Sequence, residues 1–169
     1  MTIRLGTAAD AAVLAALARD TFSETFASTN DATDMALHLE RAYGVPQQSA
    51  ELADSSITTL LAEAAGEAAA YAQLRAGPVP DCVSGSAPIE LWRFYVQQGW
   101  HGRGIAQALM ARVVAEAKVA GAKTLWLGVW EHNLRARAFY VKCGFADVGE
   151  HVFLVGTDPQ TDRVMAKPL

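Results

Sequence analysis

The stretch YVQQGWHGRGIAQALMARVV, residues 95–114, joins a strand to a helix through a glycine-rich turn. An extended, β-branched and aromatic segment ends at the turn, and a strong helix former begins directly after it. The first backbone N–H groups of such a helix have no intrahelical partner, and with the positive end of the helix dipole they form an anion site. Gly102 and Gly104 let the backbone come close to the anion, and Arg103 between them adds a permanent charge. The stretch therefore predicts a phosphate or pyrophosphate site.

Two common phosphate-binding turns do not fit these residues. A P-loop has Lys and then Ser or Thr after its second glycine, where this chain has Ile105 and Ala106. A dinucleotide-binding turn needs Gly or Ala at the position of Gln107 and a place in an early βαβ unit, and this chain offers neither. A plain strand-to-helix turn, whose glycines only relieve backbone strain, remains as an alternative at this point.

A second informative stretch is LWLGVWEHNLRARAFYVKCGF, residues 125–145. Its first six residues are typical of a buried strand. Asn133 is a good helix N-cap, and apolar residues follow it at helical spacing. Gly144 stands where a left-handed helix end is expected. We therefore predict a strand, a short loop and a helix over this stretch.

The two stretches together resemble the GCN5-related N-acetyltransferases. Residues 101–106, HGRGIA, are similar to the acetyl-CoA turn of that family, with His101 standing where the family pattern has Gln or Arg. The pattern Asn-x-x-Ala-x-x-Phe-Tyr-x-x-x-Gly-Phe, which runs from Asn133 to Phe145, looks like the next element of the same fold. The resemblance is strong over residues 88–169, and it covers residues 1–80 only in their general arrangement.

The resemblance implies an α/β fold with a mixed, mostly antiparallel sheet, flanking helices and splayed central strands. It implies acetyl-CoA as the cosubstrate, with its pantetheine arm held between the strands that end at Val96 and Val129. By this resemblance Asn133 contacts the arm and Tyr140 donates a proton to the leaving sulfur. The remaining cofactor-binding residues it implies are the backbone of Phe94, Tyr95 and Val96 for the arm, and His101, Gly102, Arg103, Gly104, Ile105, Ala106 and Gln107 for the pyrophosphate.

A general base is harder to assign. Strict alternation along residues 89–94 places Glu90, Trp92 and Phe94 on one face of a strand. A carboxylate at Glu90 could take the proton of the incoming ammonium, or it could be the structural partner of a neighbouring arginine. Glu131 and His132 are weaker candidates. The sequence shows no Ser-His-Asp or Cys-His constellation, which favours direct attack in a ternary complex over an acetyl-enzyme.

The 169 residues suit one N-acetyltransferase domain, residues 1–169, in a composition that is 51% hydrophobic and 19% charged. Cys82 and Cys143 are expected to be reduced thiols in a cytoplasmic protein, since no secretory signal is evident. The histidines and cysteines lack metal-ligand spacing, so we predict no metal. No apolar run reaches the length of a membrane span. A net charge of −4 without a dense basic cluster argues against nucleic acid.

The charges are unevenly distributed along the chain. Residues 20–63 carry a net charge of −7, and residues 93–142 carry +6. The basic half contains the predicted phosphate turn, and an acidic half suits a cationic acceptor because a charged cleft concentrates the opposite charge. For any single residue, a solvated helix face is the simpler explanation.

The acceptor is predicted to be a small-molecule amine. Residues 149–156 and 160–167 are similar to the ends of bacterial spermidine/spermine N-acetyltransferases, which indicates a polyamine. A protein N-terminus or lysine is an alternative acceptor, and a non-catalytic acyl-CoA sensor is an alternative function. The aromatic-bearing C-terminal strands offer a surface for a homodimer.

The remaining pattern predicts strands at 2–5, 57–62, 68–75, 89–96, 150–155 and 163–167. Helices are predicted at 7–18, 31–43, 47–53 and 105–120, with the helix after Asn133 as the last. Residues 21–30 are predicted to be a loose connection, 77–87 a surface loop, and 156–160 the final turn.

Overall fold

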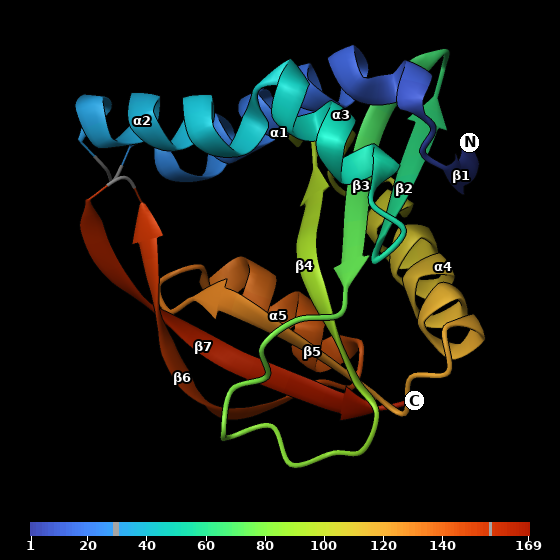
Figure 1. Ribbon diagram of the computed structural model, residues 1–169, viewed down its shortest axis with the longest axis vertical. Coiled ribbons are helices and arrows are strands. Elements are labelled where there is room, and N and C mark those ends of the chain that lie inside the picture. The colour runs from blue at the N-terminus through green and yellow to red at the C-terminus, as the bar shows by residue number, and fades with distance from the viewer. Residues whose placement is uncertain (29–30, 156) are drawn as a thin grey trace.

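A seven-stranded sheet runs through the protein in the order β1-β2-β3-β4-β5-β7-β6 (Figure 1). This computed structural model describes residues 1–28, 31–155 and 157–169. The strands are β1 (Thr2–Leu5), β2 (Ile57–Ala64), β3 (Glu67–Arg75), β4 (Pro88–Val96), β5 (Thr124–Trp130), β6 (Ala146–Val155) and β7 (Asp158–Pro168). The α-helices are α1 (Ala11–Phe26), α2 (Ala32–Tyr43), α3 (Val45–Ala53), α4 (Ile105–Val119) and α5 (Leu134–Lys142), and short 3₁₀ turns occupy Ala8–Asp10 and Gln98–Trp100. The predicted α/β class and mostly antiparallel sheet are confirmed.

The two central strands diverge. β4 and β5 form the parallel pair of the sheet, and their register covers only Pro88 to Glu90 against Thr124 to Trp126. Each strand then continues for several residues without its neighbour: β4 to Val96 and β5 to Trp130. The predicted splayed centre is therefore present, and it leaves backbone groups of both strands outside the ladder.

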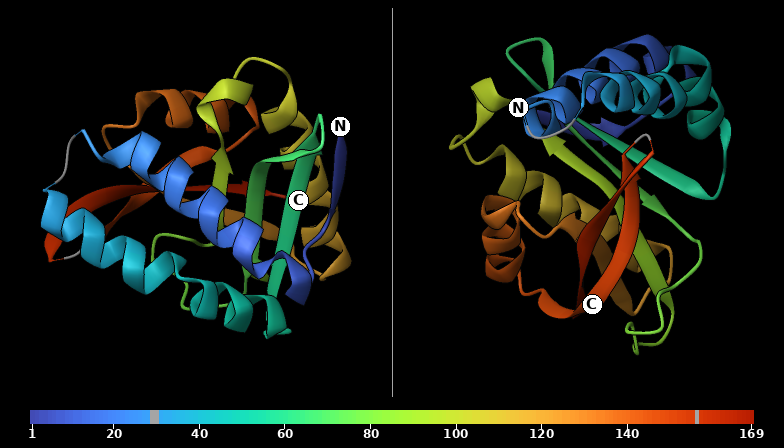
Figure 2. Two further views of the ribbon diagram at one scale, coloured as in Figure 1. Left: turned by 90° about the horizontal axis from the view of Figure 1, so that it is seen from above. Right: turned by 90° about the vertical axis from the view of Figure 1, so that its left-hand side faces the viewer.

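Helices cover both faces of the sheet. α1, α2 and α3 lie together on one face, and α4 and α5 lie on the other (Figure 2). A core cluster beneath α1 and α2 contains Leu14, Phe22 and Tyr71, all at most 1% exposed. The cluster on the opposite face contains Leu109 and Val113 of α4, both fully buried. Successive side chains of each strand point alternately into these two clusters, so the sheet is the middle layer of three, with helices on both sides.

α1 differs from the prediction. It continues without a break to Phe26, so the loose connection predicted from residue 21 is wrong for residues 21–26, while residues 29 and 30 lie outside the described residues. The Thr21 hydroxyl donates to the Leu17 carbonyl oxygen at 2.8 Å, which satisfies a polar group that would otherwise favour a helix end. Phe22 and Phe26 lie one turn apart with ring centroids separated by 4.4 Å, and burial of this pair outweighs the weak local propensity.

A bulge in β4 overturns the predicted alternation. Gln73 of β3 pairs with Arg93, whereas the next residue, Leu74, pairs with Leu91, so Trp92 is an extra residue in β4. The extra residue reverses which face each later side chain occupies.

The consequence falls on Glu90 and Phe94. Leu91 and Phe94 both pack in the cluster on the α4 face, although they stand three positions apart, an odd spacing that would place them on opposite faces of a regular strand. Glu90, beside Leu91, therefore faces the α1–α2 side. Glu90 and Trp92 both contact Arg75, so the predicted common face is wrong for Phe94.

Several boundaries move by a few residues. β6 begins at Ala146 rather than at residue 150, and β7 extends from Asp158 to Pro168. The predicted final turn includes Gly156, which lies outside the described residues. None of the helices within the described ranges has the length and apolarity needed to cross a bilayer.

Candidate active site

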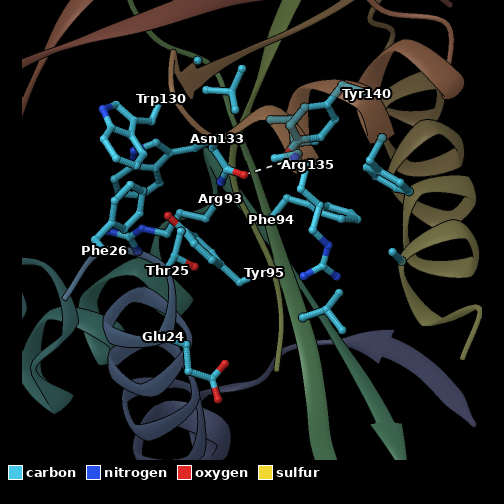
Figure 3. Close-up of a pocket in the computed structure, with 18 of the residues that line it drawn as sticks. Glu24, Thr25, Phe26, Arg93, Phe94, Tyr95, Trp130, Asn133, Arg135 and Tyr140 are labelled. Atoms are coloured by element: carbon cyan, nitrogen blue, oxygen red, sulfur yellow. Dashed lines mark hydrogen bonds between the residues drawn. The ribbon is translucent and has the colours of Figure 1, made fainter. Parts of the chain in front are cut away.

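A cavity of about 1020 Å³ lies where β4 and β5 diverge. Residues of α1, β4, the start of α4, β5, α5, β6 and β7 line it. Figure 3 shows Thr25 and Phe26 of α1 near Trp130, with Phe94 and Tyr140 on the opposite side toward α5. The cavity therefore contacts elements from both faces of the sheet through the gap between the two central strands.

The glycine-rich turn forms one end of this cavity. Gly102 and Gly104 have φ values of +76° and +80°, and Gly104 is the N-cap of α4. These conformations favour glycine because a Cβ atom is disfavoured there. The first hydrogen bond of α4 runs from Ala108 N to Gly104 O, so the preceding N–H groups, at residues 105–107, lie ahead of the helical ladder. Gly102, Gly104 and residues 105–107 all line the cavity, as an anion site requires.

The side chains of His101 and Arg103, both in the turn, contact other residues of the protein. The His101 ring lies 2.7 Å, measured from Nε2, from the carbonyl oxygen of Val96, and so braces the end of β4. Arg103 is exposed, and its guanidinium stacks over Trp100 at 4.9 Å from the ring centroid. His101 lines the cavity, whereas the exposed Arg103 side chain contacts Trp100 instead.

Asn133 begins α5 at the edge of the cavity. Its Oδ1 atom accepts a hydrogen bond from the Ala136 N–H at 3.1 Å, as predicted for an N-cap (Figure 3). α5 ends near Gly144, which has a φ of +88°, the predicted left-handed conformation. The cap uses only the amide oxygen of Asn133, so its amide nitrogen is the atom left to serve a ligand in the cavity.

Tyr140 lies deep in the same cavity wall. It is 7% exposed, and its ring meets Phe94 and Phe145 edge to face at centroid distances of 6.2 and 5.7 Å. Burial raises the pKa of the Tyr140 phenol above its usual range, because the charged phenolate is poorly solvated there. The side chain is therefore protonated at neutral pH, as a proton donor must be.

Glu90 also lines the cavity, on the α1–α2 side. It is 7% exposed and accepts a hydrogen bond from Arg75 Nε, and the Arg75 guanidinium in turn lies over the Trp92 ring at 3.9 Å. The structural alternative that the sequence left open for Glu90, an ion pair with a neighbouring arginine, is present.

Sequence reasoning missed the far side of the cavity. His151 of β6 and Asp162 of β7 line it together with Gly128, and the sequence indicated a site role for none of the three. Their proximity depends on strand pairing between segments of the chain that the sequence does not align. A glycine in the middle of the apolar strand 125–130 is the one signal that could have drawn attention to this side.

A contact between distant segments lies beside α2, outside the lining of the cavity. The backbone N–H of Thr157 donates to Asp34 Oδ1 at 2.9 Å, and the Thr157 hydroxyl donates to the same oxygen at 2.8 Å. The contact ties the β6–β7 hairpin to α2, as Figure 1 shows at the left of the molecule. Within the described residues, no group of three or more His, Cys, Asp or Glu side chains is arranged to hold a metal ion.

Comparison with known proteins agrees with this geometry. Residues 14–145 match the acetyltransferase (GNAT) family. An uncharacterized N-acetyltransferase of the pepI 3′ region of Lactobacillus delbrueckii subsp. lactis is 32% identical over 154 residues, which cover 91% of this chain and 89% of the relative. An uncharacterized N-acetyltransferase of Mycobacterium bovis is 38% identical over 118 residues, 70% of this chain and 71% of the relative.

Solved structures show the same fold. The PaiA N-acetyltransferase of Thermoplasma acidophilum, in complex with coenzyme A, aligns over 100% of both chains with a TM-score of 0.77 at 21% identity. These comparisons support the family but not the spermidine/spermine subgroup that the C-terminal stretch resembles. The chain belongs to the acetyltransferase (GNAT) family and is an N-acetyltransferase that uses acetyl-CoA.

Proposed function

We propose that the protein transfers the acetyl group of acetyl-CoA directly to the primary amine of a small cationic acceptor, with a polyamine as the first candidate. The observation that carries this proposal is the single cavity that passes through the gap between β4 and β5. On the α4 and α5 side the cavity ends at a backbone anion site, and on the other side it ends among aromatic and acidic side chains. Because its lining extends from Glu24 to Asp162, we also propose that residues 1–169 act as one domain.

The donor side of the cavity suits acetyl-CoA. The N–H groups at the start of α4 would hold the pyrophosphate, together with the close backbone approach that Gly102 and Gly104 allow. The part of β4 from Phe94 to Val96, which pairs with β3 but not with β5, would hold the pantetheine arm through its backbone. Asn133 would donate from its amide nitrogen to the same arm.

Tyr140 is the proposed general acid. In direct transfer the nitrogen attacks the thioester carbon, the C–N bond forms, and the C–S bond breaks to release a thiolate. A protonated phenol beside the leaving sulfur supplies the proton that this thiolate needs. Its place in the cavity wall, against Phe94 of β4, supports this role.

The acceptor side supports a small cationic substrate. Glu90 and Asp162 line it, and Phe26 and Trp130 supply apolar surface with ring centroids 5.7 Å apart. The alternative acceptor, a protein N-terminus or lysine, is tested by the lysine peptide in the assay below. The other alternative, a non-catalytic acyl-CoA sensor, does not require Tyr140 in the cavity wall.

The test is thiol release from acetyl-CoA with spermidine, spermine, small monoamines, amino acids and a lysine peptide. Polyamine turnover that falls about 10²-fold or more in Tyr140→Phe would support both the substrate class and the acid. Turnover of the lysine peptide alone would replace the small acceptor with a protein. Saturable acetyl-CoA binding without turnover of any amine would favour the sensor.

Homodimerisation through the C-terminal strands stays a prediction. β6 is the last strand of the sheet, and Leu154 on it is 56% exposed. Light scattering coupled to size exclusion would give the mass in solution, and a Leu154→Lys variant would lower it if this edge forms the interface.

A further inference from the structure

Asp162 is a buried carboxylate in the wall of the cavity. It lies on β7, opposite Trp130 of β5 and His151 of β6, so the side chains of all three residues lie on the same face of the sheet. The residue is only 8% exposed and lines the cavity. Its Oδ1 atom has no hydrogen-bond partner within the described residues. A buried carboxylate oxygen without a partner is costly, and such groups are concentrated at functional sites.

Gly128 shows where this carboxylate lies. A Cβ atom added to Gly128 would stand 3.0 Å from Asp162 Oδ2 and 3.0 Å from His151 Nε2. Asp162 and His151 thus fill the space directly over Gly128, in the strand that borders the gap. A larger residue at position 128 would push both side chains away, so the absence of a side chain there brings the carboxylate to the edge of the gap.

The charged groups around Asp162 leave its carboxylate without a cation. His151 of β6 is adjacent, with Nε2 3.9 Å from Oδ2, and burial lowers the pKa of His151, so the ring is largely neutral at neutral pH. Glu90 of β4, which raises the pKa of His151 in part, is itself paired with Arg75 of β3. On α2, His38 lines the same cavity, and burial lowers its pKa as well. The next residue of β7, Arg163, is bonded to Asp147 and Glu150 instead.

Desolvation shifts the pKa of Asp162 in the opposite direction from the pKa values of His38 and His151. It raises the pKa of the carboxyl to about 7. A carboxylate of this pKa accepts a proton at neutral pH and returns it to solvent, which is the balance that a general base needs. Glu90 is the poorer acceptor of the two, because protonation would break its ion pair with Arg75.

We propose that Asp162 binds the ammonium group of the acceptor and accepts its proton before the nitrogen attacks the thioester. This inference rests on the proposed function and names the base of the same site. The ammonium N–H bond breaks, the proton bonds to Asp162, and the electron pair stays on nitrogen. That pair then forms the C–N bond while the C–S bond breaks. Tyr140 protonates the thiolate and recovers a proton from the acetylated nitrogen, and Asp162 releases its proton to solvent, so one proton is released per turnover.

The experiment compares Asp162→Asn with the matched carboxylate variant Glu90→Gln. The pH dependence of kcat/KM for the amine that is turned over fastest is measured for each enzyme between pH 5 and 9. We expect the wild type to lose activity below an apparent pKa of about 7, the value that burial gives Asp162. Asp162→Asn should lower kcat/KM by about 10²-fold or more at pH 8 and remove this acidic limb, and Glu90→Gln should retain the limb. Acetyl-CoA affinity, measured by calorimetry, should be unchanged in Asp162→Asn, which also shows that the variant is folded.

Three results would overturn the inference. One is an acidic limb that persists in Asp162→Asn, and another is its loss in Glu90→Gln. The third is an Asp162→Asn enzyme with a raised acceptor KM at an unchanged kcat, because the carboxylate would then hold the cation without accepting its proton.

A readout other than activity separates this inference from the proposed function. With ¹³C-labelled aspartate, one carboxyl resonance of the enzyme saturated with coenzyme A, which cannot transfer an acetyl group, should titrate near pH 7 and be missing from Asp162→Asn. Adding the best acceptor should lower the pKa of that resonance, and spermidine serves as the probe if no amine is turned over. An unmoved resonance would refute ammonium binding at Asp162. If the wild type turns over no amine at all, the proposed function fails whether or not spermidine moves the resonance.

Discussion

Gly104 and Gly121 bracket helix α4 with nearly the same backbone conformation, at φ values of +80° and +81°. Only the first lines the cavity, at the predicted pyrophosphate site. For both glycines, no atom lies within 4 Å of an added Cβ, so alanine at either position meets no clash, only backbone strain.

The pair gives a matched test of the anion site. Gly104→Ala and Gly121→Ala should each lower the free energy of unfolding by about 1–2 kcal/mol, since both force alanine into a left-handed conformation. Gly104→Ala should in addition weaken acetyl-CoA binding by about tenfold or more, because the strained turn shifts the N–H groups at the start of α4. Calorimetric titration with acetyl-CoA measures the difference, and equal affinities in the two variants would contradict the assignment of the turn.

Asn133 carries two separable roles. Asn133→Ala should lower the free energy of unfolding by about 1 kcal/mol, because the Ala136 N–H loses its cap. It should also raise the KM for acetyl-CoA. Asn133→Ser keeps a capping oxygen but has no amide nitrogen, so it should restore most of the stability and leave the KM raised. Thermal unfolding and steady-state kinetics separate the effects. A Ser variant with a wild-type KM would mean that Asn133 is a cap alone.

A buried network beneath the acceptor side holds β4 in place. Arg93 and Glu51 are 6% and 3% exposed and form an ion pair. Glu51 also accepts from Gln47 and Gln73, at 2.9 and 3.1 Å. Glu51→Gln should lower the free energy of unfolding by about 3–5 kcal/mol, because it leaves the Arg93 guanidinium buried without a counter-charge.

A surface pair provides the control for that change. Glu63 binds Arg4 at 2.7 Å with 38% of its side chain exposed, and Glu63→Gln should cost less than about 1 kcal/mol. Urea unfolding of the two variants compares them directly. Equal losses would show that burial does not govern the strength of these pairs.

The raised pKa of Asp162 predicts a pH-dependent stability. Below the ordinary pKa of 3.8 the carboxyl is protonated in both the folded and unfolded states and contributes nothing. Between pH 3.8 and about 7 the unfolded state releases the proton while the folded state keeps it, so stability falls as pH rises. Above pH 7 the full penalty, about 4 kcal/mol, is present.

Asp162→Asn removes this titration. Its stability relative to the wild type should therefore increase by about 4 kcal/mol between pH 4 and pH 8. Urea unfolding of both proteins at the two pH values measures the change, and the other titrating groups cancel in the comparison. A constant difference between the two proteins would mean that the carboxyl is not desolvated.

Much of the donor side could be predicted from the sequence because its determinants are local. The turn from Gly102 to Gly104 precedes its helix directly, and the Asn133 cap lies three residues from the N–H that it accepts. Such short spacings can be recognised in a sequence without knowledge of the fold. The bulge at Trp92 could not be predicted from the sequence, because an extra residue in β4 is defined only by its pairing with β3. This one extra residue places Glu90 and Phe94 on opposite faces of the sheet.

The acceptor side was hidden for the same reason. The proximity of Gly128, His151 and Asp162 depends on the pairing of three strands, two of which are separated from the first by helix α5. Helix α1 shows a related effect, because packing of Phe22 and Phe26 extends it through residues with no strong helical preference.

The sequence by itself determined most of the elements, the glycine turn before α4 and the family, because each depends on the short-range spacing of glycines, caps and apolar residues. Only the tertiary structure decided which carboxylate is paired and which lies without a cation. Both are acidic side chains on strands, but Glu90 meets Arg75 across a ladder, whereas Asp162 is buried over a glycine beside a largely neutral histidine. The ionisation of a carboxyl is set by its solvation and its neighbours, and strand pairing fixes both.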